Sequence, residues 1–206
     1  DLTPYIEKYC PNYLRLLETS GGREINLRAT TVDGKILAFA RPTFTGEPGD
    51  AIFVRRDWAE ALGLEMPKTT DEYREVLRAF KTKDPNQNGK ADEIPLSGAV
   101  NTWAAEPVWF FANAFIYTDQ NNFLKVENGK VDFVANKPEW KEALKFVNSL
   151  YKEKLIDPGA FTQTQAQMQQ LGAGGDVNTL GSVTCGHLAM AVDINSGDRH
   201  KEYGPV

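Results

Sequence analysis

The sequence predicts an α/β fold, and three observations indicate it. Residues 51–55 (AIFVR) form a short apolar run with β character, whereas residues 73–80 carry apolar side chains at the spacing of one helix face. Candidate strands and helices also alternate along most of the chain, which is typical of a mixed sheet flanked by helices. Since 206 residues are enough to bury one core of this kind, we expect a single α/β unit over residues 1–206.

The N-terminal part of the chain predicts small elements separated by turns. Prolines at positions where helices begin predict two short helices within residues 3–18. Residues 33–40 (DGKILAFA) start with a turn dipeptide and continue as a β-prone run, which predicts a strand. The prolines and glycines of the following RPTFTGEPGD predict a loop before the strand at residues 51–55.

Two helices are expected after that strand. Asp57 is expected to cap the first helix, which Gly63 ends. Thr69 and Glu72 have the spacing of a capping box, and they begin the second helix. Its apolar face, at positions i, i+3, i+4 and i+7, consists of Tyr73, Val76, Leu77 and Phe80.

The C-terminal part predicts a β-hairpin and a long helix. Asn128-Gly129 between two β-prone runs is typical of a two-residue hairpin turn. The long helix is expected over residues 137–154, with Trp140, Leu144, Val147 and Tyr151 along its apolar face. The remaining elements expected here are strands at 94–98 and 187–193, a helix at 106–116 and a polar helix in QTQAQMQQLGAGG.

Composition and charge exclude several classes of protein. Hydrophobic residues make up 41% and charged residues 25% of the chain, which is ordinary for a globular protein. The net charge is −5 and no basic stripe is present, so we expect no nucleic-acid partner. No apolar run reaches the ~18 to 20 residues that cross a bilayer. The start, DLTPYIEKY, does not resemble a signal peptide, which leaves a cytoplasmic protein and a processed or excised piece as alternatives.

The two cysteines decide nothing about the compartment. Cys10 and Cys185 lie far apart in the sequence and could form one disulfide, but free thiols are the simpler interpretation.

The stretch 84–93 (DPNQNGKADE) places side-chain oxygens around one glycine at the spacing of a calcium loop. An EF-hand takes ligands from positions 1, 3, 5, 7 (a carbonyl), 9 and 12, with glycine at position 6. Position 12 is Pro95 here, so Glu93 is the substitute carboxylate. This hard oxygen set suits Ca²⁺ better than Mg²⁺ or Zn²⁺, although a solvated Asx-rich turn has a similar composition. The predicted ligands are Asp84, Asn86, Asn88, Lys90 through its carbonyl, Asp92 and Glu93.

Residues 53–98 resemble the extracellular solute-binding proteins of ABC transporters, in the group that takes up oligosaccharides and includes the alginate-binding proteins. The resemblance lies in Arg56-Asp57-Trp58, Leu62-Gly63-Leu64, Pro67-Lys68-Thr69 and the 84–93 loop, in that order and with close spacing. It implies a periplasmic-binding-protein-like (type II) lobe whose 84–93 loop binds a structural calcium. Family members are longer and hold the ligand between two lobes, so the resemblance implies one excised lobe with parts of the other lobe missing.

The resemblance also implies partners and a location. The ligand is a carbohydrate, expected to be an oligosaccharide, and a membrane permease receives it. The protein would act as a monomer outside the cytoplasm, at the cell surface or in the periplasm, with a lipid anchor in its full-length form. A calcium-stabilised carbohydrate-recognition or adhesion module without a transporter is the alternative.

Candidate ligand-binding residues lie in loops at strand ends, where an open α/β sheet faces a crevice. Flat aromatic side chains stack on the apolar face of a sugar ring, and amides or charged groups bind its hydroxyls. Trp103 is the first candidate, although a packing role at the start of a helix is an open alternative. The others are Arg41, Phe44, Asn101 and Thr102.

Other aromatic and charged residues are expected to be structural. Trp58, Trp109 and Trp140 fall on apolar helix faces and are expected in the core. Arg55 and Arg56 close a strand and could reach the ligand cleft, but a solvated surface pair is the expected arrangement.

No catalytic constellation is recognisable in the sequence. His187 and His200 have no partner motif, since the chain contains no serine elbow, no H-E-x-x-H and no glycine-rich phosphate loop. The carboxylate pairs are explained by helix starts and the metal loop, so we do not expect an enzyme.

Overall fold

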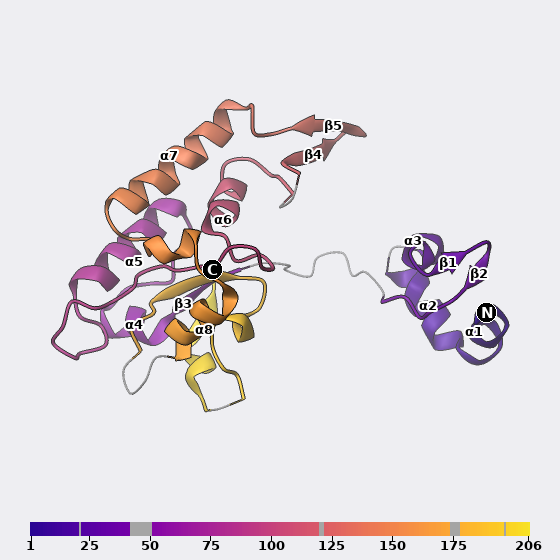
Figure 1. Cartoon of the computed structure of the whole chain (residues 1–206), viewed down its shortest axis with the longest axis horizontal. Coiled ribbons are helices and arrows are strands. Elements are labelled where there is room, and N and C mark those ends of the chain that lie inside the picture. Colours follow the sequence, from indigo (N-terminus) through magenta and orange to yellow (C-terminus); the bar gives the residue numbers. More distant parts are fainter. Residues whose placement is uncertain (21, 42–50, 120–121, 174–177, 196) are drawn as a thin grey trace. The chain divides into compact units, whose positions relative to one another are not determined.

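The computed structural model describes residues 1–20, 22–41, 51–119, 122–173, 178–195 and 197–206 (Figure 1). The chain divides into two compact units, Asp1–Pro48 and Gly49–Val206. This division differs from the single unit expected over residues 1–206. The boundary falls in RPTFTGEPGD, whose two prolines and two glycines are typical of a connection between units. That both units come from one lobe of a longer protein stays a prediction.

The N-terminal unit contains three helices and a two-stranded hairpin among its described residues. Their bounds are Thr3–Tyr9 (α1), Pro11–Thr19 (α2), Arg23–Leu27 (α3), Thr31–Val32 (β1) and Lys35–Ile36 (β2). The two helices predicted within residues 3–18 are confirmed. Of the strand expected at 33–40, only β2 (Lys35–Ile36) forms. Asp33 and Gly34 have positive φ and make the turn between β1 and β2. The core of this unit consists of Ile6, Leu17, Leu27, Ile36 and Ala40.

The C-terminal unit is built on a sheet with β3 (Ala51–Arg55) at its centre. β6 (Ser182–Cys185) and β7 (Tyr203–Pro205) pair with β3 on its two sides, both antiparallel. The strand expected at 94–98 contributes parallel bridges, Ile94 to Leu180 and Ser97 to Val183, so the sheet is mixed.

The strand expected at 187–193 is wrong. Leu188–Met190 is a 3₁₀ turn, and the strand lies at β6, whose four residues are all buried. The strand at β6 was not predicted because two of its residues are polar. In the fold, Ser182 and Thr184 are buried and donate hydrogen bonds to the carbonyls of Pro95 and Ala105.

Helices lie around this sheet, whereas a second hairpin projects away from it beside the start of α7 (Figure 1). Their bounds are Arg56–Ala61 (α4), Thr70–Thr82 (α5), Pro107–Asn113 (α6), Leu124–Glu127 (β4), Lys130–Phe133 (β5), Pro138–Lys152 (α7) and Gln165–Ala173 (α8). Three short 3₁₀ turns complete the described part: Pro158–Phe161, Leu188–Met190 and Arg199–Glu202. β4 and β5 pair antiparallel, and Asn128 and Gly129 join them with positive φ at both positions.

The main core lies between α5, α7 and the sheet. The predicted α5 face, Tyr73, Val76, Leu77 and Phe80, is buried as expected. The buried face of α7 is Trp140, Ala143, Phe146, Val147 and Leu150, whereas Leu144 and Tyr151 are exposed. Two apolar stripes are possible on α7, and packing of Phe146 against Phe111 and Phe115 selects the stripe that contains Phe146.

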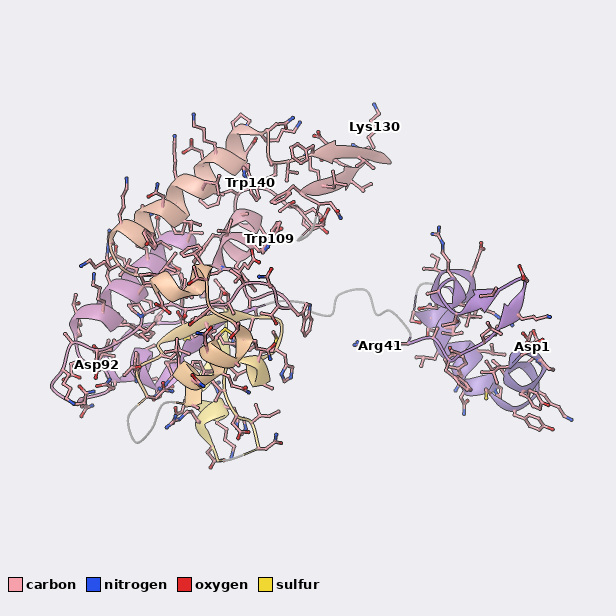
Figure 2. The ribbon with its side chains drawn as sticks, in the orientation of Figure 1. Asp1, Arg41, Asp92, Trp109, Lys130 and Trp140 are labelled. Carbon is pink, nitrogen blue, oxygen red and sulfur yellow. The ribbon has the colours of Figure 1, made fainter. Side chains whose placement is uncertain are left out.

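The three helical tryptophans lie largely inside the C-terminal unit. Trp58 and Trp140 are buried, which confirms their expected core role, and Trp109 is half-buried. Figure 2 shows Trp109 and Trp140 close together between α6 and α7, and their ring centroids are 6.2 Å apart.

The prediction that Arg55 and Arg56 form a solvated surface pair is wrong for Arg55. Its side chain is buried, Nε and Nη2 donate to the Asp57 carboxylate at 2.7 and 2.5 Å, and the guanidinium lies 4.8 Å from the Trp58 ring. Arg56 is exposed, as expected. Asp57 also does not cap α4, because Arg55 occupies the N-cap position and Asp57 lies in the first turn.

Both cysteines are free thiols, as expected. Burial raises the pKa of the Cys185 thiol to about 12, so this group stays protonated at neutral pH and is a poor nucleophile. Among the described ranges, no helix combines the length and apolar character that crossing a bilayer requires.

Replacing Thr69 with alanine is expected to lower the free energy of unfolding by about 1 kcal/mol, because the capping box of α5 is lost. Thr69 Oγ1 accepts the Glu72 amide hydrogen at 3.2 Å, and the Glu72 carboxylate accepts the Lys68 and Thr69 amide hydrogens. Urea unfolding measures this loss, and Thr70→Ala, at the next position, is the matched control. Equal losses in the two variants would contradict a specific capping role.

The same box predicts a pH dependence. The Lys68 amide hydrogen, as the largest cause, holds the pKa of Glu72 below its usual range. The contribution of this carboxylate is therefore present above the ordinary carboxyl pKa and is lost as the pH falls through the lowered value.

Candidate ligand and metal sites

Trp103 lies on a loop between the bridging segment at 94–97 and the start of α6. Its side chain is 57% exposed, whereas Trp58 is 2% and Trp140 8% exposed. A core role for Trp103 is therefore wrong. An exposed indole on a short loop can present one ring face to a ligand.

Buried polar side chains hold this loop at both ends. Thr184 Oγ1 donates to the Ala105 carbonyl at 2.7 Å, and Gln163 Nε2 donates to Ser97 Oγ at 2.8 Å and to the Gly98 carbonyl at 2.5 Å. The Ala99 amide also donates to the Ala105 carbonyl at 2.9 Å, which closes the loop on itself. The loop is thus anchored to β6 and to the segment that follows the Pro158–Phe161 turn.

The loop contains two strained backbone positions. Asn101 and Ala104 have φ values of 55° and 46°, in the left-handed region that non-glycine residues rarely adopt. Such conformations persist where the surroundings determine the backbone, and they are enriched at ligand sites.

The indole ring of Trp103 lies against the backbone of Gly186, directly after β6. A Cβ atom at Gly186 would lie 2.5 Å from Cδ2 and 2.7 Å from Cε2 and Cε3 of this ring. Such distances are shorter than van der Waals contact, so the ring occupies the space that a side chain would need.

Polar groups lie close to the same loop. Thr102 Oγ1 donates to Gln165 Oε1 at 2.8 Å, which ties the loop to the start of α8 and leaves the amide nitrogen of Gln165 available as a donor. Asn101 and His187 are exposed, and His187 adjoins Gly186 in the chain. The structure thus brings the predicted residues Asn101 and Trp103 into one loop.

Sequence reasoning missed Gly186, Gln165 and His187 as neighbours of this loop. The sequence contains only a weak indication of them, a glycine just beyond a short β-prone run and the first residue of a polar helix. Contact between segments so far apart in the chain depends on the fold.

The two remaining ligand candidates are placed differently. Arg41 is exposed and belongs to the N-terminal unit. Phe44 lies within residues 42–50, outside the described residues. Their roles stay predictions.

The predicted metal loop begins with a carboxylate that organises the backbone. Asp84 Oδ1 accepts the Asn88 amide hydrogen at 3.1 Å, and Oδ2 accepts the Gly89 amide hydrogen at 2.9 Å. Positive φ values at Asp84, Gln87 and Gly89 turn the chain tightly around this carboxylate.

The remaining side chains converge on Asp92, which Figure 2 shows on a peripheral loop of the C-terminal unit. The side-chain amides of Asn86 and Asn88 donate to the Asp92 carboxylate at 3.3 and 3.1 Å. The side-chain oxygens of Asn86 and Asn88 accept the amide hydrogens of Asn88 and Lys90 at 3.0 and 2.8 Å. To present these oxygens to a cation beside Asp92, both amides would have to turn and give up those hydrogen bonds.

Glu93 has the electrostatic character of a cation ligand. Burial, as the largest cause, and the negative charges of Asp84 and Asp92 raise its pKa above the usual range. Its Oε1 atom is buried, and within the described part of the chain it has no hydrogen-bond partner. Both features fit an ion that supplies positive charge at this point.

Carboxylates alone do not complete a metal site. Over the described ranges, no three Asp, Glu, His or Cys side chains are grouped so that they could hold an ion. A cation in this loop would therefore also need the side-chain amides of Asn86 and Asn88 and the Lys90 carbonyl as ligands, and hard oxygen donors of this kind suit calcium.

Comparison with known proteins identifies relatives. The family model of bacterial extracellular solute-binding proteins matches residues 19–182. The fructooligosaccharide ABC transporter substrate-binding protein FusA of Streptococcus pneumoniae serotype 4 is 40% identical over 164 residues, which cover 76% of this chain and 30% of that protein. Lipoprotein LipO of Bacillus subtilis is 32% identical over 166 residues, covering 76% of this chain and 29% of LipO.

Solved structures agree with this assignment. FusA of S. pneumoniae in complex with kestose matches 99% of this chain and 41% of its own length, with 32% identity and a TM-score of 0.70. An EF-hand mutant of FusA in complex with fructo-nystose gives the same values. An HMO-binding, ABC-transporter-associated solute-binding protein from Bifidobacterium longum infantis matches all of this chain and 42% of its own length, with 25% identity and a TM-score of 0.73.

The chain spans less than half the length of these relatives. Its mixed α/β architecture is that of a periplasmic-binding-protein-like fold. Because the family model covers most of the sequence, the chain belongs to the bacterial extracellular solute-binding protein family.

Proposed function

We propose that this chain is part of the substrate-binding component of an ABC importer, which captures an oligosaccharide between two lobes and delivers it to a membrane permease. The observation that carries the proposal is the exposed Trp103 indole on a loop held by buried hydrogen bonds. Two relatives support the class of ligand, since FusA is solved with kestose and the B. longum protein is named as HMO-binding.

The mechanism is capture without chemistry. A sugar ring stacks on the outer face of Trp103, and Asn101, Thr102 and Gln165 offer polar groups to its hydroxyls. The second lobe closes over the ligand, and the free energy of closure comes from contacts that the ligand makes only in the closed state. No bond is made or broken in this mechanism, so we expect no enzymatic activity.

The metal part of the proposal is a structural Ca²⁺ in the 84–93 loop. Asp84, Asn86, Asn88, Asp92 and Glu93 would hold it through side-chain oxygens, and Lys90 through its carbonyl. The raised pKa of Glu93 supports this, as does the relative with a mutated EF-hand. The bound ion would offset two of the three negative charges of these carboxylates and hold the connection between α5 and the bridging segment.

Family membership and the similarity to LipO support a proposal for the location. We propose an extracytoplasmic protein that acts as a monomer and carries a lipid anchor in its full-length form, like the lipoprotein that it resembles.

Replacing Trp103 with alanine in the full-length protein is expected to weaken oligosaccharide binding by roughly 10- to 100-fold, since a stacked aromatic ring contributes about 1.5–3 kcal/mol. Calorimetric titration with kestose and a panel of other oligosaccharides measures the affinity. Tyr117→Ala, at an aromatic residue that is 69% exposed outside this loop, is the control and should bind like the wild type.

Two results would contradict the proposal: equal affinities in the wild type and Trp103→Ala, or hydrolysis products after incubation. Uptake of the bound sugar by cells with and without the full-length protein separates an importer component from a carbohydrate-recognition or adhesion module.

A further inference from the structure

We propose that Gly186 is a positioning residue for Trp103, because its missing side chain provides the seat on which the indole ring lies flat. The expected effect on the stacking of a sugar ring rests on the proposed function. The contact between Gly186 and the indole does not depend on any ligand.

The contact distances place Gly186 beneath the middle of the indole. The three ring atoms nearest to an added Cβ are Cδ2, Cε2 and Cε3, at 2.5, 2.7 and 2.7 Å. Cδ2 and Cε2 form the bond shared by the two rings, and nearly equal distances to these atoms mean that the Cβ would meet the ring face rather than its edge. The face towards Gly186 is therefore covered, and the opposite face accounts for the 57% exposure of Trp103.

Close approach, and not backbone conformation, explains glycine at this position. Gly186 is absent from the glycines with positive φ, so alanine could adopt its backbone conformation. The conflict arises only with the Trp103 ring, which is the situation in which a glycine permits another group to approach the backbone.

The strand side of this contact is held in place. Cys185 and Thr184, just before Gly186, are fully buried in β6, and Thr184 also holds the Ala105 carbonyl of the Trp103 loop. Because the strand and the loop end are joined by this bond, a methyl group at Gly186 would lift or tilt the indole towards solvent.

A tilted indole would be a poorer sugar platform. The polar groups that accompany it, on Asn101, Thr102 and Gln165, belong to the anchored loop and to α8 and would stay in place. A single bound ligand could then no longer stack on the ring and also form hydrogen bonds with these polar groups. Gly186 thus selects ligands that present a flat apolar ring face at a set distance from hydrogen-bonding hydroxyls.

The first test uses the chain without ligand. Trp103 fluorescence is isolated as the difference between the wild type and Trp103→Phe, and again as the difference between Gly186→Ala and the double variant Gly186→Ala/Trp103→Phe. We expect Gly186→Ala to shift the Trp103 emission to longer wavelength and to increase its quenching by acrylamide. Unchanged emission and quenching would overturn the proposal.

A double-mutant cycle on thermal unfolding separates positioning from a general structural role. Gly186→Ala is expected to lower the melting temperature in the wild-type background and to have little effect in the Trp103→Ala background, which leaves room for the methyl group. If Gly186→Ala does not fold while the double variant does, the proposal is supported. Equal losses in both backgrounds, or failure of both variants to fold, would overturn it.

Ligand titration of the full-length protein completes the test. Gly186→Ala is expected to weaken oligosaccharide binding roughly tenfold, which corresponds to about 1.4 kcal/mol, and to have no further effect when Trp103 is already alanine. If no sugar binds the wild type, the proposed function fails, while fluorescence and unfolding still decide the role of Gly186.

Discussion

Replacing Phe80 with alanine is expected to lower the free energy of unfolding of the C-terminal unit by about 3–5 kcal/mol, the loss typical of a buried phenylalanine. Phe80 is fully buried on α5, and its ring packs edge-on against Trp58 with 5.2 Å between the centroids. A Cβ added at Gly181 would lie only 2.7 Å from its Cδ2 atom, so the backbone beside β6 already touches the ring.

These contacts make the site unable to collapse after truncation. The strand backbone cannot move towards the cavity without breaking its pairing with β3, and the cavity term adds to the loss of buried apolar area. Urea unfolding followed by tryptophan fluorescence measures the effect, since Trp58 contacts the altered site. Phe133→Ala, at a ring that is 46% exposed on the β4–β5 hairpin, is the control. Similar losses in the two variants would show that the core does not depend on Phe80 packing.

The α5 helix was predictable because its determinants are local. The Thr69–Glu72 capping box and the apolar face that includes Phe80 are both contained within a few turns of sequence. β3 was predictable for the same reason, since Ile52, Phe53 and Val54 form a β-prone run that ends at two arginines.

β6 was missed because its polar residues are satisfied by distant partners. Ser182 binds the Pro95 carbonyl and the Tyr73 hydroxyl, and Thr184 binds the Ala105 carbonyl. Local sequence makes such residues look exposed, whereas a buried hydroxyl with a partner is stable in the core. Arg55 was misplaced for a similar reason, because Trp58 and Glu202 surround it only in the folded chain.

The ligand site also combines features that local sequence predicts with contacts that only the fold shows. Exposure of Trp103 could be predicted from its loop context, but the seat at Gly186 and the hydrogen bond to Gln165 require knowledge of which segments meet. The turn at residues 84–92 depends on local contacts, because Asp84 and Asp92 accept hydrogen bonds from residues of the same segment. Its six proposed calcium ligands, all within residues 84–93, stay a prediction.

Adding calcium is expected to stabilise the chain by about 2.7 kcal/mol when its concentration reaches roughly 100 times the dissociation constant. The physical reason is electrostatic: without an ion, Asp84, Asp92 and Glu93 are like charges at close range, which helps to raise the pKa of Glu93. Thermal unfolding with chelator and with calcium up to about 10 mM measures the gain. Sites of extracellular modules have dissociation constants of roughly 10⁻⁴ to 10⁻³ M, so this concentration is about 100 to 10 times the dissociation constant and the expected gain is about 2.7 to 1.4 kcal/mol.

Asp92→Asn tests the loop itself, since it removes one charge at constant shape. It is expected to abolish most of the calcium-dependent shift, whereas Asp71→Asn, at an exposed carboxylate on α5, should respond like the wild type.

The pH dependence gives a second check. A carboxyl with a raised pKa favours the folded state below its unfolded pKa, and this contribution is lost as the pH rises through the raised value. Calcium requires the ionised form, so its stabilising effect should be larger at about pH 7 than at about pH 5. Equal melting temperatures with calcium and with chelator at the higher pH would show that this loop binds no calcium. Asp84 would then serve only to turn the backbone.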